Sequence, residues 1–237
     1  MSVLVVTGTS TGVGKTVVTA AVAALAAARG SRVAVVKPAQ TGIGPDEPGD
    51  LDDVRRLAGV TDLHEHRRLR DPLSPAAAAR HEGVTPLDLH ESARRVRELA
   101  AARDLVVVEG AGGLLVRFDD DGATIADLAR ELRAPVLVVA APALGTLNHT
   151  ALTLEALAYR GLTFAGVVLG SWPREPDLAC RSNVRDLETL AARPLAGAMP
   201  EGAGRLDASE FLLAARGGLG PSLGGVWDAA DFRRAHD

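Results

Sequence analysis

Short apolar runs of Val, Leu and Ala alternate along this chain with longer Ala-, Leu- and Arg-rich stretches. This alternation is typical of βαβ units, in which helices cover both faces of a mostly parallel sheet. The buried strands are predicted at residues 3–7, 33–37, 105–109, 136–140, 164–170 and 195–198. The helices are predicted at residues 15–29, 51–58, 86–102, 125–132, 147–160 and 178–191. The pattern therefore predicts an α/β fold with helices on both faces of the sheet.

The remaining segments predict shorter elements. Residues 75–80 are expected to form a short helix with a serine cap, and residues 43–50, with two glycines and two prolines, a loop. From about residue 201 the chain is rich in glycine. We expect a C-terminal arm or lid there, with one short helix near residues 209–215, loosely held toward its end. No repeat or linker is visible, so residues 1–237 are predicted to be a single domain.

Composition narrows the function classes. A hydrophobic content of 47% is ordinary for a globular protein, and the 3% of aromatic residues leaves Val, Leu and Ala to fill the core. The net charge of −4 gives no general attraction to nucleic acid or anionic membranes, so neither partner is expected. The single Cys180 excludes internal disulfides. No apolar run approaches the ~20 residues of a membrane helix, and no signal peptide is visible, so a cytoplasmic location is expected.

The first predicted strand leads into the glycine loop GTSTGVGKT, residues 8–16, and then into a helix. Loop and first-turn N–H groups converge at such a junction, where the helix dipole also favours anions. Lys15 could then reach terminal phosphates and Thr16 could ligate Mg²⁺, as in the Walker A pattern. That pattern has four residues before its Gly-Lys pair, whereas five separate Gly8 from Gly14 here. A glycine-rich turn with a solvated lysine is the alternative, but the order of elements favours phosphate binding.

Charged residues end two of the other predicted strands. Lys37 closes the second strand and would add a second cation beside Lys15, suited to charge that develops during phosphoryl transfer. Its alternative is a lysine that extends to the rim of the sheet. Glu109 closes the third strand and could hold Mg²⁺ together with Thr16, or it could cap a helix. For Asp50, helix capping and metal binding are both open on the residues alone.

Residues 143–150 precede and open a further helix, whose amides could receive a second anion such as a carboxylate. Thr146 or Asn148 could instead serve only as the helix cap. Neither a Ser/His/Asp triad nor a metal-spaced histidine cluster can be assembled from this sequence.

Five segments together resemble the dethiobiotin synthetase family in order and spacing, over roughly residues 3–200. They are TGTSTGVGKT (7–16), KPAQTG (37–42), SP (74–75), EGAGG (109–113) and LGTLNH (144–149). The longer glycine loop is itself this family's form. The resemblance implies a P-loop NTPase-like fold and an ATP- and Mg²⁺-dependent ligase of biotin biosynthesis. Its substrates would be 7,8-diaminononanoate, CO₂ and a nucleoside triphosphate, and its products dethiobiotin, the nucleoside diphosphate and phosphate.

The resemblance also implies roles by position. The implied catalytic residues are Lys37, Lys15 and Thr11, and the implied magnesium ligands are Thr16, Asp50 and Glu109. The implied nucleotide-binding residues are Gly12, Val13, Gly14, Lys15, Thr16, Val17, Asp50, Glu109, Gly110, Ala111, Gly112, Gly170, Ser171, Pro200, Glu201 and Gly202. The implied substrate-binding residues are Thr11, Lys37, Thr41, Leu144, Gly145, Thr146, Leu147, Asn148 and Asn183. Residues 144–148 would act from the partner subunit, which implies a homodimer with a shared active site.

One segment departs from the family pattern. Family members often carry an Asn-Asp pair that reads adenine after the fifth strand, whereas this chain has Gly170-Ser171. Losing a side-chain amide removes one or two neutral hydrogen bonds, each about 0.5–1.5 kcal/mol. We therefore expect weak discrimination between bases, with CTP or GTP usable beside ATP.

Two other P-loop classes share parts of this pattern. ATPases that partition chromosomes or position septa carry a second lysine early in the loop, where this chain has Ser10. They also often end in a basic amphipathic helix, which is not expected in this chain. Cobyrinate amidases append a glutaminase domain, for which this chain is too short. A nucleotide-binding module without turnover is the third alternative.

Overall fold

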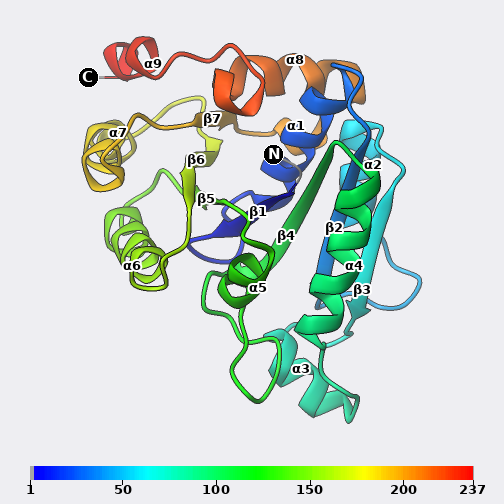
Figure 1. Cartoon of the computed structure of the whole chain (residues 1–237). Helices are drawn as coiled ribbons and strands as arrows, with labels where there is room; N and C mark the ends of the chain where they lie inside the picture. The colour runs from blue at the N-terminus through cyan, green and yellow to red at the C-terminus, as the bar shows by residue number, and fades with distance from the viewer. Residues whose placement is uncertain (1–2, 237) are drawn as a thin grey trace.

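Seven parallel strands form one sheet in the order β3-β2-β4-β1-β5-β6-β7 in the computed structural model, which describes residues 3–236 (Figure 1). The strands are β1 (Val3–Gly8), β2 (Val33–Gln40), β3 (Leu63–Arg68), β4 (Leu105–Gly113), β5 (Val136–Ala140), β6 (Phe164–Trp172) and β7 (Gly197–Pro200). β1 lies in the middle of the sheet, with β4 on one side and β5 on the other. The predicted α/β fold with a parallel sheet is confirmed.

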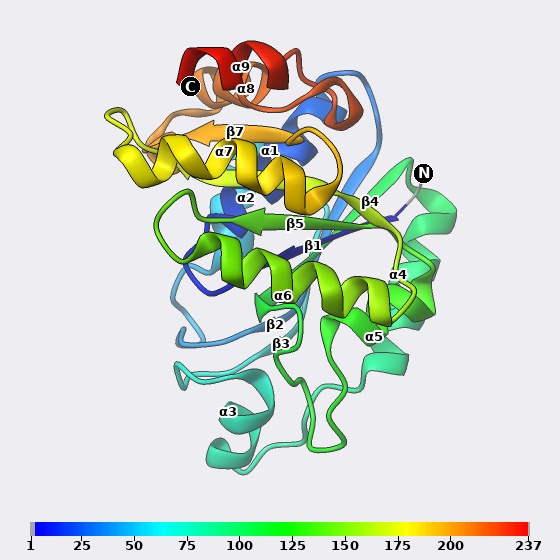
Figure 2. The same ribbon diagram turned by 90° about the vertical axis from the view of Figure 1, so that its left-hand side faces the viewer.

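Helices cover both faces of this sheet (Figures 1 and 2). The helices are α1 (Lys15–Ala27), α2 (Asp50–Ala58), α3 (Pro75–Glu82), α4 (Leu89–Ala102), α5 (Ile125–Leu132), α6 (Thr146–Tyr159), α7 (Leu178–Ala191), α8 (Ala208–Gly218) and α9 (Ala229–His236), with short 3₁₀ turns at Ala203–Arg205 and Pro221–Leu223. One buried cluster packs α1, α2 and α8 against the sheet, and a second packs α4 to α7 against the other face. Val, Leu and Ala make up most of both clusters, as expected from the low aromatic content.

Two elements were not predicted from the sequence. β3, with the sequence LHEHRR, is the edge strand next to β2, and all six of its residues are partly exposed. A polar edge strand lacks the apolar run that identifies a buried strand. α9, with the sequence AADFRRAH, is only eight residues long and has one large apolar side chain and no buried residue, so its segment gives little signal in the sequence.

The C-terminal segment packs more tightly than the loosely held arm that its glycines suggested. The expected short helix is present within α8, where Phe211 and Ala215 are completely buried on the α1 face. Leu219 is also buried and forms a bridge to Gly197 at the start of β7. At the end of the chain, the Trp172 and Phe232 rings meet edge to face at 4.9 Å and hold α9 against β6.

The sheet brings the loops of the candidate site to one edge. Because all strands are parallel, the segments after β1, β2 and β4 emerge at their shared carboxyl end, where ligands of open α/β sheets bind. No helix within residues 3–236 is long and apolar enough to cross a membrane.

Candidate active site

The glycine loop between β1 and α1 has the backbone geometry of an anion site. Gly12 and Gly14 adopt left-handed conformations, with φ of 75° and 94°, which residues with side chains rarely adopt. Gly14 is the N-cap of α1, and no side chain caps the helix. The first N–H groups of α1 are therefore left to a ligand, and the helix dipole favours a negative one. Lys15 folds back over the loop, and its Nζ donates to the Ser10 carbonyl at 3.1 Å.

A buried cluster of charged side chains lies beside this loop. Lys37 Nζ donates to Glu109 Oε1 at 2.8 Å and to the Gly110 carbonyl at 3.3 Å, and it also pairs with Asp50. The side chain of Lys37 is 3% exposed and that of Glu109 is fully buried. The two alternatives, a rim position for Lys37 and a capping role for Glu109, are therefore excluded.

The charges of this cluster shift the pKa values of its members. Burial alone would lower the pKa of Lys37, but the Glu109 and Asp50 carboxylates outweigh it and raise that pKa. Burial likewise opposes ionisation of Asp50, yet the Lys37 ammonium keeps the pKa of Asp50 below its usual value. For Lys15, burial and then the nearby Lys37 lower the pKa. The site therefore gathers two lysines and two carboxylates, and Lys37 is paired with both carboxylates.

The donor atoms of the cluster suit a magnesium ion. The Thr16 hydroxyl donates to Glu109 Oε1 at 2.9 Å, while the buried Glu109 Oε2 has no hydrogen-bond partner among residues 3–236. Asp50 is the first residue of α2, whose N-cap is Gly49, so a capping role for Asp50 is excluded. Mg²⁺ bound with a nucleotide takes one or two carboxylates, and the phosphates and water complete its shell. One hydroxyl and two carboxylates, one of which has an oxygen without a hydrogen-bond partner in the described part of the chain, fit that requirement.

One cavity of about 880 Å³ joins the glycine loop to these charges. The predicted site residues that line it are Thr11, Gly12, Gly14, Lys15, Thr16, Val17, Lys37, Thr41, Asp50, Glu109, Ala111 and Gly112. Two predicted neighbours, Val13 and Gly110, do not line it. Val13 is buried, and Gly110 contributes its carbonyl to Lys37. Gln40 lines the cavity as well, and its importance was not evident from the sequence.

The residues predicted to lie near the nucleotide base form a separate group, near the ends of strands β6 and β7, on the other side of β1 from β2 and β4. Gly170 and Ser171 lie near the end of β6, and Pro200 ends the neighbouring β7 just before Glu201 and Gly202. Gly170 packs against the glycine loop so closely that a Cβ there would come within 1.9 Å of the Val13 carbonyl oxygen. Gly170 thus contacts the phosphate loop, and its strand lies on the side of β1 opposite the strand of Lys37.

Residues 144–148 lie outside the large cavity. Gly145, with φ of 95°, is the N-cap of α6, so Thr146 and Asn148 are not its caps. Leu144 is 88% exposed. Asn183 on α7 is buried, and its Nδ2 donates to the carbonyls of Pro142 at 2.8 Å and Ala143 at 3.3 Å. Asn183 therefore holds this loop in place.

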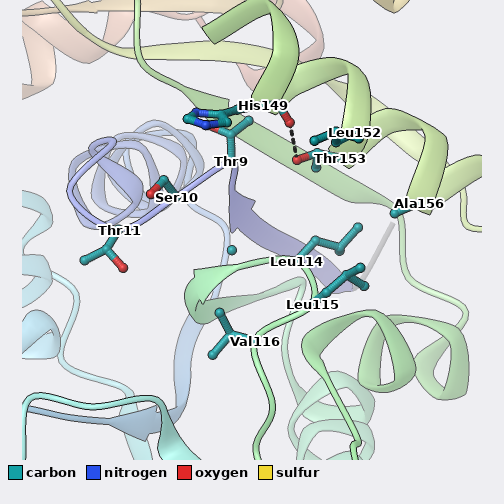
Figure 3. Close-up of a pocket in the computed structure, with 11 residues that line it drawn as sticks. Thr9, Ser10, Thr11, Leu114, Leu115, Val116, His149, Leu152, Thr153 and Ala156 are labelled. Atoms are coloured by element: carbon teal, nitrogen blue, oxygen red, sulfur yellow. Dashed lines mark hydrogen bonds between the residues drawn. The ribbon is translucent and has the colours of Figure 1, made fainter. Parts of the chain in front are cut away.

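A second cavity, of about 380 Å³, separates the glycine loop from α6 (Figure 3). Its lining combines hydroxyl groups of the loop with apolar side chains of the segment after β4 and of α6: Thr9, Ser10, Thr11, Leu114, Leu115, Val116, His149, Leu152, Thr153 and Ala156. Of these residues, only Thr11 has a role predicted from the sequence. Leu115 and Leu152 are 47% and 58% exposed, a property that the sequence alone does not reveal, so no sequence signal indicated them.

Comparison with known proteins decides the family. A family model described as "AAA domain" matches residues 2–204. The ATP-dependent dethiobiotin synthetase BioD of Frankia casuarinae is 66% identical over 237 residues, covering all of both chains. The protein of the same description from Streptomyces coelicolor is 56% identical, covering 100% of this chain and 99% of its own. The chain belongs to the dethiobiotin synthetase family. The resemblance of the five sequence segments to the dethiobiotin synthetase family is therefore confirmed.

Solved structures of other P-loop proteins share the fold. The septum site-determining protein MinD of Pyrococcus horikoshii, complexed with Mg-ADP, is 16% identical with a TM-score of 0.59, covering 94% of both chains. A ParA family ATPase from Chlorobium tepidum is 15% identical with a TM-score of 0.56, covering 94% of this chain and 95% of its own. At this identity the likeness shows the fold alone. The full-length sequence matches place the chain among the dethiobiotin synthetases and not among these switch ATPases.

Proposed function

We propose that this protein closes the ureido ring of dethiobiotin in biotin biosynthesis, with a nucleoside triphosphate as the energy source. In this reaction an amine of 7,8-diaminononanoate takes up CO₂ to form a carbamate. A carbamate oxygen attacks the γ-phosphorus and releases the nucleoside diphosphate. The second amine then attacks the carbamate carbon, and inorganic phosphate leaves as the ring closes.

The observation that carries this proposal is the pair of lysines in one cavity. A carbamate and a triphosphate are both anionic, so their approach is opposed by charge repulsion. Lys15 at the glycine loop and the buried Lys37 line the same 880 Å³ cavity and would bind the two anions side by side. Because Glu109 and Asp50 stabilise the Lys37 ammonium, Lys37 carries its charge in the cavity before the two anions bind.

The donor atoms described above support Mg²⁺ as the metal of this site. Thr16, Asp50 and Glu109 would hold it, with the orphaned Glu109 Oε2 as one ligand. When bound, the ion would neutralise charge on the triphosphate oxygens. Lys37, which contacts both carboxylates, would then be freed in part to face the carbamate.

For the organic substrate we propose Thr11 and Thr41 as contacts, since both line the cavity that contains Lys37. The substrate carboxylate would bind at residues 144–148 of a second subunit, with Asn183 either in direct contact or holding that loop. Two observations support a homodimer. Residues 144–148 are absent from the lining of the cavity in their own subunit, and α6 presents exposed apolar side chains at Leu152 and Tyr159. Isolated apolar residues are common on surfaces, but a row along one helix favours an interface.

On the nucleotide side we propose that Gly170, Ser171 and residues 200–202 surround the base. The base-reading amide of the family pattern is missing at Gly170, and Ser171 is exposed. ATP would therefore compete with CTP or GTP on nearly equal terms.

A coupled assay for phosphate release tests the proposed reaction. Diaminononanoate, bicarbonate, Mg²⁺ and ATP together should give phosphate and dethiobiotin in equal amounts, and omission of any one component should abolish release. Phosphate release without the diamine would favour a switch ATPase. Nucleotide binding without any release would favour a binding module that lacks turnover.

A further inference from the structure

Gln40, the last residue of β2, contacts the start of α2. Its side chain is almost fully buried, and its Oε1 accepts a hydrogen bond from the Asp50 backbone N–H at 3.0 Å. Its Nε2 donates to the Thr41 carbonyl at 3.3 Å. Both polar ends of this side chain are therefore engaged within the protein, although Gln40 lines the large cavity.

Arg68, the last residue of β3, lies opposite Gln40 in the parallel register of the two strands. Its Nε and Nη2 donate to the two carboxylate oxygens of Glu65 at 2.7 and 2.9 Å. Its Nη1 donates to the carbonyls of Gly44 at 3.0 Å and Glu47 at 2.6 Å. A bidentate pair of this kind fixes the guanidinium in one orientation. Arg68 therefore fastens the loop between β2 and α2 to the edge of the sheet.

The two side chains meet at Gly49, the N-cap of α2. A Cβ built on Gly49 would lie 3.0 Å from Arg68 Nη2 and 3.1 Å from Gln40 Oε1. The Gly49 N–H in turn donates to Asp52 Oδ2 at 2.9 Å. The first turn of α2 is thus held from three sides, immediately before the carboxylate that pairs with Lys37.

We propose that Gln40 and Arg68 are positioning residues for Asp50 as a magnesium ligand. The segment 43–49 would otherwise be a flexible glycine- and proline-containing loop, and Asp50 would lose orientation with it. The brace, meaning Gln40 together with Arg68, sets the position of the Asp50 backbone, and Lys37 sets its side chain. This inference rests on the proposed function, because it assumes that the metal binds between Asp50 and Glu109.

Nucleotide affinity with and without metal tests the brace. The dissociation constant of ADP is measured by calorimetry in EDTA and in excess Mg²⁺, for the wild type, Gln40→Leu and Arg68→Met. The ratio of the two constants reports the contribution of the metal and does not depend on turnover. In the wild type, the dissociation constant in EDTA divided by that in Mg²⁺ gives the factor by which the metal strengthens ADP binding. We expect this factor to be about fivefold smaller in both variants, which is the effect of about one hydrogen bond. Their dissociation constants in EDTA should stay unchanged, because the glycine loop is not altered.

Arg70→Met is the matched control, because Arg70 is an exposed arginine two positions further along with no side-chain hydrogen bond or ion pair among the described residues. Its ratio should equal that of the wild type. Circular dichroism establishes whether each variant is folded. If Arg68→Met does not fold, Gln40→Leu, which removes no charge, still tests the brace. Wild-type ratios in folded variants would overturn the brace alone. A wild type whose ADP affinity does not respond to Mg²⁺ would overturn the metal site of the proposed function, and the brace with it.

Discussion

Lys37 Nζ and Glu109 Oε1 lie 2.8 Å apart at the carboxyl ends of adjacent strands. They face each other because β2 and β4 pair in a register that sets Val36 opposite Val108, so the next residue of each strand emerges at the same level. Both side chains are withdrawn from water. Such a pair adds little net stability as a whole, but the loss of one partner leaves an uncompensated buried charge.

Replacement of Lys37 by methionine should lower both turnover and stability. We expect kcat to fall by at least about a hundredfold, the order of loss seen when one preorganised charge is removed from a transition state. The free energy of unfolding should fall by about 3–5 kcal/mol at neutral pH, because Glu109 remains buried without its cation. Steady-state kinetics and urea denaturation measure the two effects.

The double variant Lys37→Met/Glu109→Gln is the control for this experiment. It removes both charges, so most of the lost stability should return while turnover stays low. A Lys37→Met variant with nearly normal kcat would exclude Lys37 from the reaction.

Glu109→Gln should weaken the dependence of the enzyme on magnesium. The amide keeps the shape of the side chain but removes the negative charge and the orphaned carboxylate oxygen that fit a metal. The Mg²⁺ concentration for half-maximal phosphate release should rise by about tenfold or more. Glu210→Gln, an exposed change on α8, should leave the titration unchanged. An unaltered titration in Glu109→Gln would remove this residue from the metal site.

The parts of the site found from the sequence lie where an apolar run stops. Lys37 and Glu109 could be predicted because each directly follows the apolar run of a buried strand, although both strands continue beyond them, to Gln40 and Gly113. The glycine loop could be predicted because it joins a strand to a helix. For Asp50 the residues alone left both helix capping and metal binding open. The structure excludes capping, because Gly49 is the N-cap of α2. Arg68 was missed because its strand is polar along its length, and its contacts with the loop after β2 form only when that edge strand is in place.

The affinity for nucleotide should depend on the ionisation of Lys15. Burial and the adjacent Lys37 lower the pKa of Lys15 below its usual value of 10.5, whereas a bound phosphate would raise it again. Affinity should therefore be constant below the lowered pKa and fall as pH rises between that pKa and the higher pKa of the complex. Titration of ADP binding against pH in EDTA measures this. Lys15→Arg stays charged over the whole range, so its affinity should not decline. A wild type without any decline up to pH 10.5 would contradict the lowered pKa.

An amide at position 170 should not restore a preference for adenine. Any Cβ there would come within 1.9 Å of the Val13 carbonyl oxygen, so Gly170→Asn must displace the phosphate loop. We expect KM to rise for ATP, CTP and GTP alike, and Gly170→Ala should show the same rise without any amide. Ser171→Asn, at an exposed neighbour, should leave the loop intact. Competition among the three nucleotides measures these effects, and the wild-type kcat/KM values should agree within about tenfold. A strong ATP preference of the wild type would contradict weak base discrimination.

A charge on the exposed face of α6 should break the proposed dimer. Leu152 is 58% exposed and lines the second cavity beside the glycine loop, and Tyr159, two turns further along, is 91% exposed. If this face binds a second copy, Leu152→Glu should convert the protein to a monomer in sedimentation experiments.

The kinetic consequence of that change distinguishes a shared site from a merely structural contact. Loss of the partner's residues 144–148 should raise KM for diaminononanoate by more than about tenfold, the effect of a lost charge-assisted contact, while the affinity for ADP is retained. Leu213→Glu is the matched control, since Leu213 is a 71% exposed leucine on α8. A monomeric wild type, or a Leu152→Glu monomer with normal KM, would contradict an active site completed by the second subunit.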